Sequence, residues 1–270
     1  MEQFVNGMIG YAIRATDGDL GKVEDFLFDD KTWTIRYMVV ETGNWLSGRK
    51  VLISLAALGR PDWKSRTFSV NLTREQVKNS PDIDTQKPVF RQHETTLHKH
   101  YQWPLYWQGG YVGGYVSAYG GILGDGGMGA YGGSPGSNLS PFIAKEESGA
   151  RKSSSSDEED KDNPHLLSTK HVTGYRIFAS DGKIGHVEDF IFEDENWTLR
   201  FIVVKTGIWR PERRILLSLQ WMNRVEWGDS SLHFNIPMEV MEKSPEFDHT
   251  QKITRDYTDK LHGHYKGSGR

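Results

Sequence analysis

GKVEDFLFDDKTWTIR, at residues 21–36, returns as GHVEDFIFEDENWTLR at residues 185–200. At a constant offset of 164, 25 of the 46 positions in residues 10–55 are identical in residues 174–219. The correspondence runs without a gap to LHKHY and LHGHY near the end of each copy. Each unit is about 100 residues long, a normal size for a domain, and two copies are too few for a solenoid. The sequence therefore indicates a tandem duplication of one domain.

Composition divides the chain into three parts. We expect a first domain with a C-terminal tail at residues 1–101, a linker at 102–164 and a second domain with its own tail at 165–270. Glycine takes 13 of the 28 positions in residues 109–136, interleaved with tyrosine, and RKSSSSDEEDKD follows. Such segments bury too little apolar surface to offset their chain entropy, which predicts a disordered linker. A plain tether is favoured, although Gly/Tyr alternation is also typical of self-association tracts.

The overall composition sets broad limits on function. A net charge of −3 gives no global field that would attract nucleic acid or anionic lipid. The chain has no cysteine, which excludes disulfides, thiolate metal sites and a cysteine nucleophile, and suits a reducing compartment. We expect no signal peptide, because the N-terminus lacks a basic region followed by an apolar run, and the apolar stretches are too short to span a bilayer. These features predict a cytoplasmic protein.

The quoted segments predict a β-hairpin, because β-branched and aromatic residues flank a short polar interruption. A four-residue loop at residues 29–32 fixes the register. Period two then gathers the large side chains on one apolar face, namely Phe26, Phe28, Trp33, Ile35, Tyr37 and Val39, and in the second copy Phe190, Phe192, Trp197, Leu199 and Phe201. The same register places Asp25 opposite Arg36 and Asp189 opposite Arg200 on the other face.

The flanking sequence predicts further short strands. Asp-Gly turns precede the hairpin, and RKVLIS, RTFSVN and their counterparts read as strands. Thr73 and Gln76 form a capping box that begins a short helix, and Pro237 suits the first position of its counterpart. Several short strands with closely spaced turns indicate an all-β domain, either a small barrel or a sandwich.

The order DGxxG, VEDF, WT-hydrophobic-R, VVxTGxW and R-[KR]-hydrophobic-L-hydrophobic-S resembles the PRC-barrel domain. LHKHYQWPLYW is similar to the tail that often follows this domain in stand-alone bacterial members. The resemblance covers both copies, although the second lacks WPLYW and has PE in place of SG before its basic pair. It implies two small β-barrels of about six strands each, with short helices, joined by the linker.

The resemblance also implies a role. The family includes the cytoplasmic part of the photosynthetic reaction centre H subunit and the C-terminal half of the ribosome maturation factor RimM, and it serves mainly as an assembly surface. No catalytic residues are defined for it. We therefore expect a non-enzymatic protein-interaction or scaffolding module without cofactors. The two copies could pack as a pseudo-dimer, or the chain could form homo-oligomers.

Three alternatives stay open. One is a ribosome-associated or RNA-binding factor, which short basic clusters with aromatic neighbours suggest, although the domains are not strongly basic. Another is an assembly factor of a photosynthetic or electron-transfer complex. The third is a metal-dependent sensor that uses the His-x-His tails, with His98, His100, His262 and His264 as weak candidates for ligands. On a strand these pairs would share one side, whereas on a helix they would diverge.

Motifs of hydrolases, nucleotide-binding loops and zinc proteases are absent from the sequence. The recurring pairs Glu24-Asp25 and Glu188-Asp189 could in principle act as acid and base, but adjacent strand residues point to opposite faces. A structural role is the simpler interpretation.

Tryptophan and arginine give the best candidates for an interface. Trp45 and Trp209 each follow Thr-Gly in a predicted loop, with Arg49 or Arg213 four residues on. Such pairs are common in interface hot spots, although a tryptophan that closes the end of the barrel is the simpler interpretation. Trp103 and Trp107 form an apolar motif in the tail that needs a docking site, either on its own barrel or on another copy.

Overall fold

The computed structural model describes residues 2–81, 89, 91–107, 165–207, 212–248 and 253–266. Trp209 and residues 108–164, which make up most of the predicted linker, lie outside the described residues. None of the helices in the described ranges is long and apolar enough to cross a membrane.

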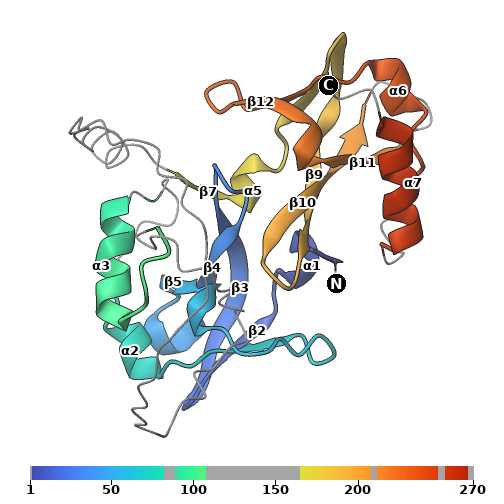
Figure 1. Ribbon diagram of the computed structural model, residues 1–270. Helices are drawn as coiled ribbons and strands as arrows, with labels where there is room; N and C mark the ends of the chain where they lie inside the picture. Colours follow the sequence, from blue (N-terminus) through green and yellow to red (C-terminus); the bar gives the residue numbers. More distant parts are fainter. Residues whose placement is uncertain are drawn as a thin grey trace, which may run out of the picture.

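The two repeats fold into similar series of short elements (Figure 1). The first has β1 (Glu2–Phe4), α1 (Val5–Met8), β2 (Ala12–Ala15), β3 (Gly18–Asp29), β4 (Ile35–Glu41), η1 (Gly43–Leu46), β5 (Lys50–Ser54), η2 (Leu55–Ala57), β6 (Thr67–Ser69), α2 (Arg74–Lys78) and α3 (Arg91–Tyr101). The second has β7 (Leu166–Ser168), α5 (Thr169–Val172), β8 (Arg176–Ala179), β9 (Gly182–Glu193), β10 (Thr198–Thr206), β11 (Arg214–Ser218), η3 (Leu219–Trp221), β12 (Met222–Glu226), β13 (Ser231–Phe234), α6 (Met238–Glu242) and α7 (Arg255–Tyr265). Here η marks 3₁₀-helices.

The strands form two mixed sheets. The six-stranded sheet has the order β5-β4-β3-β2-β6 with β7 added to β3, and the seven-stranded sheet has β11-β10-β9-β8-β13-β12 with β1 added to β9. The β2–β6 and β8–β13 pairs are parallel, and the other pairs are antiparallel. A mainly β fold with about six strands per sheet and short helices is thus confirmed. Among the described residues neither strand order closes into a ring, so both sheets have open edges.

The repeats exchange their first strands. β1 pairs with β9, placing Gln3 opposite Phe192, and β7 pairs with β3, placing Leu167 opposite Phe28. These two pairings are equivalent at the offset of 164. Figure 1 shows dark blue α1 beside the orange strands of the second repeat and yellow β7 beside blue β3. Packing of the repeats on each other, one of the two arrangements considered, is the one that the structure has.

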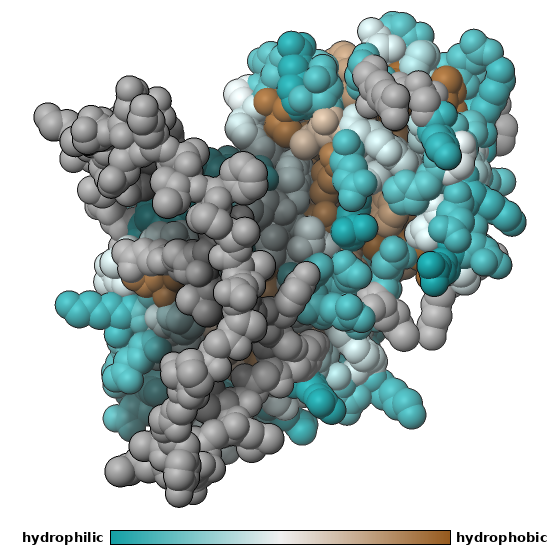
Figure 2. All heavy atoms as spheres, viewed as in Figure 1, coloured by the Kyte–Doolittle hydropathy of each residue, from teal (hydrophilic) through white to brown (hydrophobic). Residues whose placement is uncertain are grey.

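Aromatic side chains extend this exchange into the core. The Trp33 ring lies 6.2 Å from that of Trp227 in the second repeat, and the Trp197 ring lies 6.1 Å from that of Phe68 in the first. Both Trp33 and Trp197 are buried. One hydrophobic core therefore spans both repeats, and each repeat contributes a large side chain to its partner. On the face in Figure 2, the hydrophobic residues left visible form separate groups among hydrophilic ones.

The predicted register of the hairpin is wrong in both repeats. The pairs across the strands are Asp25 with Val39 and Asp189 with Val203, not Asp25 with Arg36 and Asp189 with Arg200. The six side chains predicted for one apolar face are all buried. The intervening Leu27, Met38 and Val40 are buried too, so both faces of these central strands are covered.

The turn explains the shift in register. Asp29 accepts hydrogen bonds at Oδ1 from the amides of Lys31 (3.1 Å) and Thr32 (2.8 Å), which closes the turn tightly. Trp33 then adopts a left-handed conformation (φ 53°) and leaves the ladder toward the second repeat. Phe28 pairs with Ile35 instead, after a bulge. Period two could not reveal these changes, because the second repeat supplies the contacts that favour them.

Candidate interaction site

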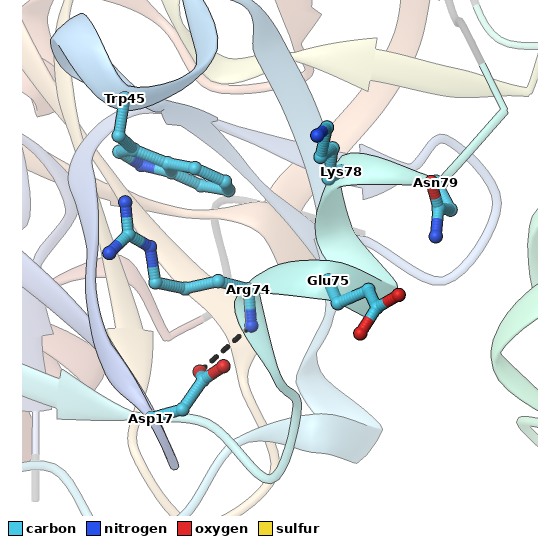
Figure 3. A pocket seen from close by; sticks show the side chains of 6 residues that line it. All are labelled: Asp17, Trp45, Arg74, Glu75, Lys78 and Asn79. Carbon is cyan, nitrogen blue, oxygen red and sulfur yellow. Dashed lines mark hydrogen bonds between the residues drawn. The ribbon is translucent and has the colours of Figure 1, made fainter.

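A surface pocket of about 450 Å³ lies beside the loop that follows β4 (Figure 3). Its lining residues are Asp17, Trp45, Arg74, Glu75, Lys78 and Asn79. The guanidinium of Arg74 lies 4.5 Å from the centre of the Trp45 ring, in cation–π geometry. Trp45 is half-buried and donates its indole N–H to the carbonyl of Leu20 (2.6 Å), which fixes the ring at the rim.

Local sequence holds α2 beside this ring. Asp17, in the predicted Asp-Gly turn, accepts the backbone N–H of Arg74 at 2.8 Å. The predicted capping box is confirmed, because Gln76 N–H donates to Thr73 Oγ1 (3.2 Å) and Thr73 N–H donates to Gln76 Oε1 (2.8 Å). Hydrogen bonds therefore hold the backbone beside the pocket in place. The lining carries two basic and two acidic side chains.

The second repeat keeps the backbone of this surface and changes its chemistry. Met238 occupies the position of Arg74, and its N–H donates to Asp181 at 2.8 Å, as Arg74 does to Asp17. Glu242 takes the position of Lys78. Trp209, the counterpart of Trp45, lies outside the described residues. Pro237 caps α6 and does not begin it, so its predicted position was wrong by one residue.

Arg49 and Arg213, both predicted interface residues, bind the ends of short helices. Arg49 donates to the carbonyls of Lys78 (3.1 Å) and Ser80 (2.8 Å). Arg213 makes the equivalent bonds to residues 242 and 244 at 2.6 and 3.1 Å. These contacts give both arginines a structural role, and their part in an interface stays a prediction.

The WPLYW tail docks on its own repeat. Trp103 stacks on Tyr101 with ring centres 4.2 Å apart, and Trp107 lies 4.4 Å from the guanidinium of Arg91. Both tryptophans are half-buried. Residues 102–107 thus pack with the first domain, although the predicted boundary placed them in the linker. This satisfies the need of the tail for a docking site.

The buried carboxylate of Glu94 contacts several side chains of this region. It is fully buried and accepts hydrogen bonds from the hydroxyls of Tyr37 (2.9 Å) and Tyr106 (2.6 Å). Arg91 (3.1 Å) and His165 Nε2 (2.5 Å) complete its partners. Burial, followed by the charge of Glu94, raises the pKa of both tyrosines. Glu94 therefore joins Tyr106 and His165, which stand in the described chain on either side of residues 108–164.

Sequence reasoning missed Glu94 and His165 as partners. A usable signal was the comparison of the copies, since Thr258 stands at the position of Glu94 and Phe201 at that of Tyr37. An ionisable residue that stands in only one copy indicates a structural feature that only this repeat has.

The His-x-His tails lie on helices α3 and α7, where a spacing of two residues places side chains on different sides of the helix. His98 contacts the hydroxyl of Tyr37 (2.6 Å) and the carbonyl of Pro104 (2.8 Å), and burial lowers its pKa. His100 and His264 each approach a backbone carbonyl, at 3.0 and 2.7 Å. The described ranges contain no group of three His, Cys, Asp or Glu side chains placed to hold a metal ion.

The acidic pairs sit where the exchanged segments cross the sheets. Asp25 accepts hydrogen bonds from the hydroxyls of Ser168 and Thr169 (2.9 Å) and from the amide of Lys170 (3.2 Å). Asp189 accepts the amide of Asn6 at 3.1 Å. Both carboxylates therefore join one repeat to the other, as the simpler structural interpretation predicted in general terms.

Fold and sites together define a β-rich protein of two strand-exchanged repeats with an arginine–tryptophan pocket on the first. Residues 1–76 match the PRC-barrel domain family, so the predicted resemblance is confirmed there. The second repeat lies outside the matched residues and is linked to this domain by its identities with the first. An uncharacterized protein of Deinococcus radiodurans is 32% identical over 111 residues, which cover 36% of this chain. The chain spans 40% of the length of that relative. At the level of the family, the match indicates a protein-interaction or assembly role.

Proposed function

We propose that the protein is a non-enzymatic interaction module of the cytoplasm, in which both repeats form one body and the first presents the Trp45–Arg74 pocket to a protein partner. Arg74 stacked on Trp45 is the observation that carries this proposal (Figure 3). Tryptophan and arginine are the residues that most often dominate binding energy at protein interfaces. The absence of cysteine supports a reducing compartment.

The difference between the repeats supports one binding surface per chain. Met238 and Glu242 replace Arg74 and Lys78 in the second repeat, and Lys243 replaces Asn79. The equivalent positions thus carry three acidic side chains and one basic side chain, instead of two of each. A partner that recognises the first surface by charge would not recognise the second. The second repeat then contributes its strand and its core to the stability of the first.

The RNA-binding alternative has less support from the basic residues. Arg49 and Arg213 donate to backbone carbonyls, and Arg214 forms a paired contact with Glu188 at 2.6 and 2.8 Å. Guanidinium groups held in this way are poorly placed to neutralise phosphates. These three arginines are therefore less available to a nucleic acid, whereas Arg60, Lys64 and Arg66 of the remaining basic cluster are exposed.

The test is a pull-down from native extract, with and without RNase, using the wild-type chain and two charge-changing variants. We expect Arg74→Glu to lose the partner at least tenfold, because the charge over Trp45 is reversed. Met238→Glu, which places the same residue at the equivalent position of the second repeat, should retain it. Recovery of the same partner by Arg74→Glu, or loss of every partner on RNase treatment, would overturn the proposal. Circular dichroism and elution volume establish that both variants fold.

A further inference from the structure

The two repeats differ in how they complete the equivalent carboxylates Asp25 and Asp189. Ser168 and Thr169, from the exchanged segment, donate hydroxyl hydrogen bonds to Asp25. Phe4 and Val5 hold the equivalent positions beside Asp189, and neither has a hydroxyl group. The second carboxylate therefore lacks two donors that the first one has.

The environment of Asp189 shows this loss directly. Its Oδ1 accepts the amides of Asn6 (3.1 Å) and Phe190 (2.7 Å), and among the described residues its Oδ2 accepts no hydrogen bond. Asp189 also lines a cavity of about 370 Å³, together with Phe4, Asn6, Gly7, Glu188, Val203 and Arg214. Burial raises the pKa of Asp189 to about 7, and Glu188 adds to this effect. The carboxylate is partly desolvated and faces open space.

The first repeat places two ammonium groups beside its equivalent acidic pair, both at the glutamate. There the ammonium of Lys170 lies 3.8 Å from Glu24 Oε1, and that of Lys50 lies 2.7 Å from the same atom. Asn6 replaces Lys170 in the second repeat, and Arg214 replaces Lys50. The first site thus holds two acidic and two basic side chains, whereas the second holds two acidic and one basic. When Asp189 is ionised, the lining of the cavity therefore carries one more negative than positive charge.

We propose that this cavity binds a primary ammonium group on a short alkyl chain, supplied by a free amine or by a lysine side chain. Asp189 accepts the N–H bonds, in place of the hydroxyls that Ser168 and Thr169 donate to the equivalent Asp25. Phe4 and Val203 provide apolar walls for the methylene groups. Glu188 is already paired with Arg214, so Asp189 is the carboxylate that meets the ligand. The volume lies at the lower end of the usual range for small-molecule sites. This site is separate from the Trp45–Arg74 pocket and does not depend on the function proposed for it.

The test titrates the full-length protein with n-butylammonium chloride and follows the backbone amide signals of Asn6 and Phe190 by NMR. We expect saturable shifts for the wild type. Asn6→Lys supplies an internal ammonium and Asp189→Asn removes the charge, so each should weaken binding at least tenfold. Lys170→Asn, at the position equivalent to Asn6, should leave these shifts unchanged. Because Asp189→Asn keeps an acceptor for the Asn6 amide, it tests the site even if Asn6→Lys fails to fold.

Two further ligands complete the experiment. n-Butanol lacks the positive charge, and Nα-acetyl-lysine methylamide carries a lysine side chain. Equal binding of butanol, or wild-type binding by Asp189→Asn, would overturn the proposal. Tenfold tighter binding of the lysine derivative than of butylammonium would identify a lysine side chain as the natural source. The reverse order would identify a free amine. Capture of the partner through Arg74 is measured separately, so the failure of one proposal leaves the other intact.

Discussion

Trp33 and Trp197 hold equivalent positions, and each places its backbone carbonyl in the other repeat. The amide of Ile35 donates to Trp197 O at 2.9 Å, and the amide of Leu199 donates to Trp33 O at 2.8 Å. Both residues take a left-handed conformation, with φ of 53° and 58°. The same two turns thus supply hydrogen bonds and aromatic rings across the junction, which makes the repeats a single cooperative body.

Trp197→Ala is expected to destabilise the whole protein, not one repeat. The ring is 2% exposed and packs on Phe68 and Phe26 of the first repeat, so its loss leaves a large cavity. Such truncations cost about 3–5 kcal/mol. We follow urea denaturation by hydrogen exchange in each repeat separately. Both repeats should unfold in one common transition, and its midpoint should lie at a lower urea concentration than in the wild type. Trp45→Ala, at a half-buried surface ring, is the control and should cost less. Two separated transitions in the wild type would contradict a shared core.

Asp25→Asn and Asp189→Asn are expected to change stability in opposite directions at pH 8. Asp25 accepts bonds from two hydroxyls, and an amide group cannot accept both at the same places, which costs about 1–3 kcal/mol. The folded protein is less stable when Asp189 is ionised, because its carboxylate is partly desolvated. Its replacement should therefore stabilise the protein by about 1–2 kcal/mol at pH 8. Urea denaturation of both variants at this pH measures the two changes, and a loss of stability in Asp189→Asn would contradict the prediction.

The pH dependence of the stability follows from the raised pKa of Asp189. The folded protein keeps the proton on Asp189 to about pH 7, whereas an unfolded aspartate loses it near the ordinary value of 3.8. Stability therefore falls between these two values and levels off above them. The charged groups lining the cavity are Glu188 on β9 and Arg214 on β11, while α1 and β10 contribute Asn6 and Val203. Thermal unfolding from pH 5 to 8 should show a shallower decline in Asp189→Asn. An unchanged slope would contradict this assignment.

Much of the architecture could be predicted from the sequence, because it depends on local patterns. Hairpins, the capping box of α2 and the strand number follow from alternation, turn residues and caps. The strand exchange and the register could not be predicted. Each depends on contacts between residues about 164 positions apart, and neither periodicity nor turn chemistry carries that information.

The residues of the candidate sites could likewise be predicted only in part. Trp45 was predicted from its loop, but its partner Arg74 lies on another element and came from the structure. Arg36 was assigned to Asp25, yet its guanidinium lies 4.2 Å from the Tyr106 ring of the tail. Long side chains reach neighbours that a strand register does not specify. Comparison of the two copies position by position is the sequence signal that would have found Glu94.

Glu94→Thr is expected to release the tail and destabilise the first repeat. It introduces the residue that the second repeat has at this position, and it leaves Arg91, His165 and two tyrosines without their buried acceptor. Removal of one partner from a buried ionic network costs about 3–5 kcal/mol. Hydrogen exchange at residues 102–107 should become faster.

Thr258→Ala is the matched control for Glu94. Thr258 bonds only to carbonyls of its own helix in the described structure, so its loss should change stability by about 0.5 kcal/mol or less. Unchanged exchange at residues 102–107 in Glu94→Thr would show that the tail is held by its aromatic contacts alone.

Gly21→Ala is expected to disrupt the first sheet. Gly21 has a φ of 152°, and a Cβ atom there would lie 1.9 Å from the carbonyl oxygen of Glu41 on the neighbouring strand. Because that atom belongs to the backbone of β4, the strands must separate, at a cost of about 2–4 kcal/mol. Gly10→Ala is the control, since Gly10 has a φ of 84° but nothing lies within 4 Å of the place that a methyl group would take there. Its cost should be that of the left-handed conformation alone, about 1–2 kcal/mol. Chemical denaturation of the two variants measures the difference, and equal losses would mean that the close approach of β3 and β4 at Gly21 relaxes without penalty.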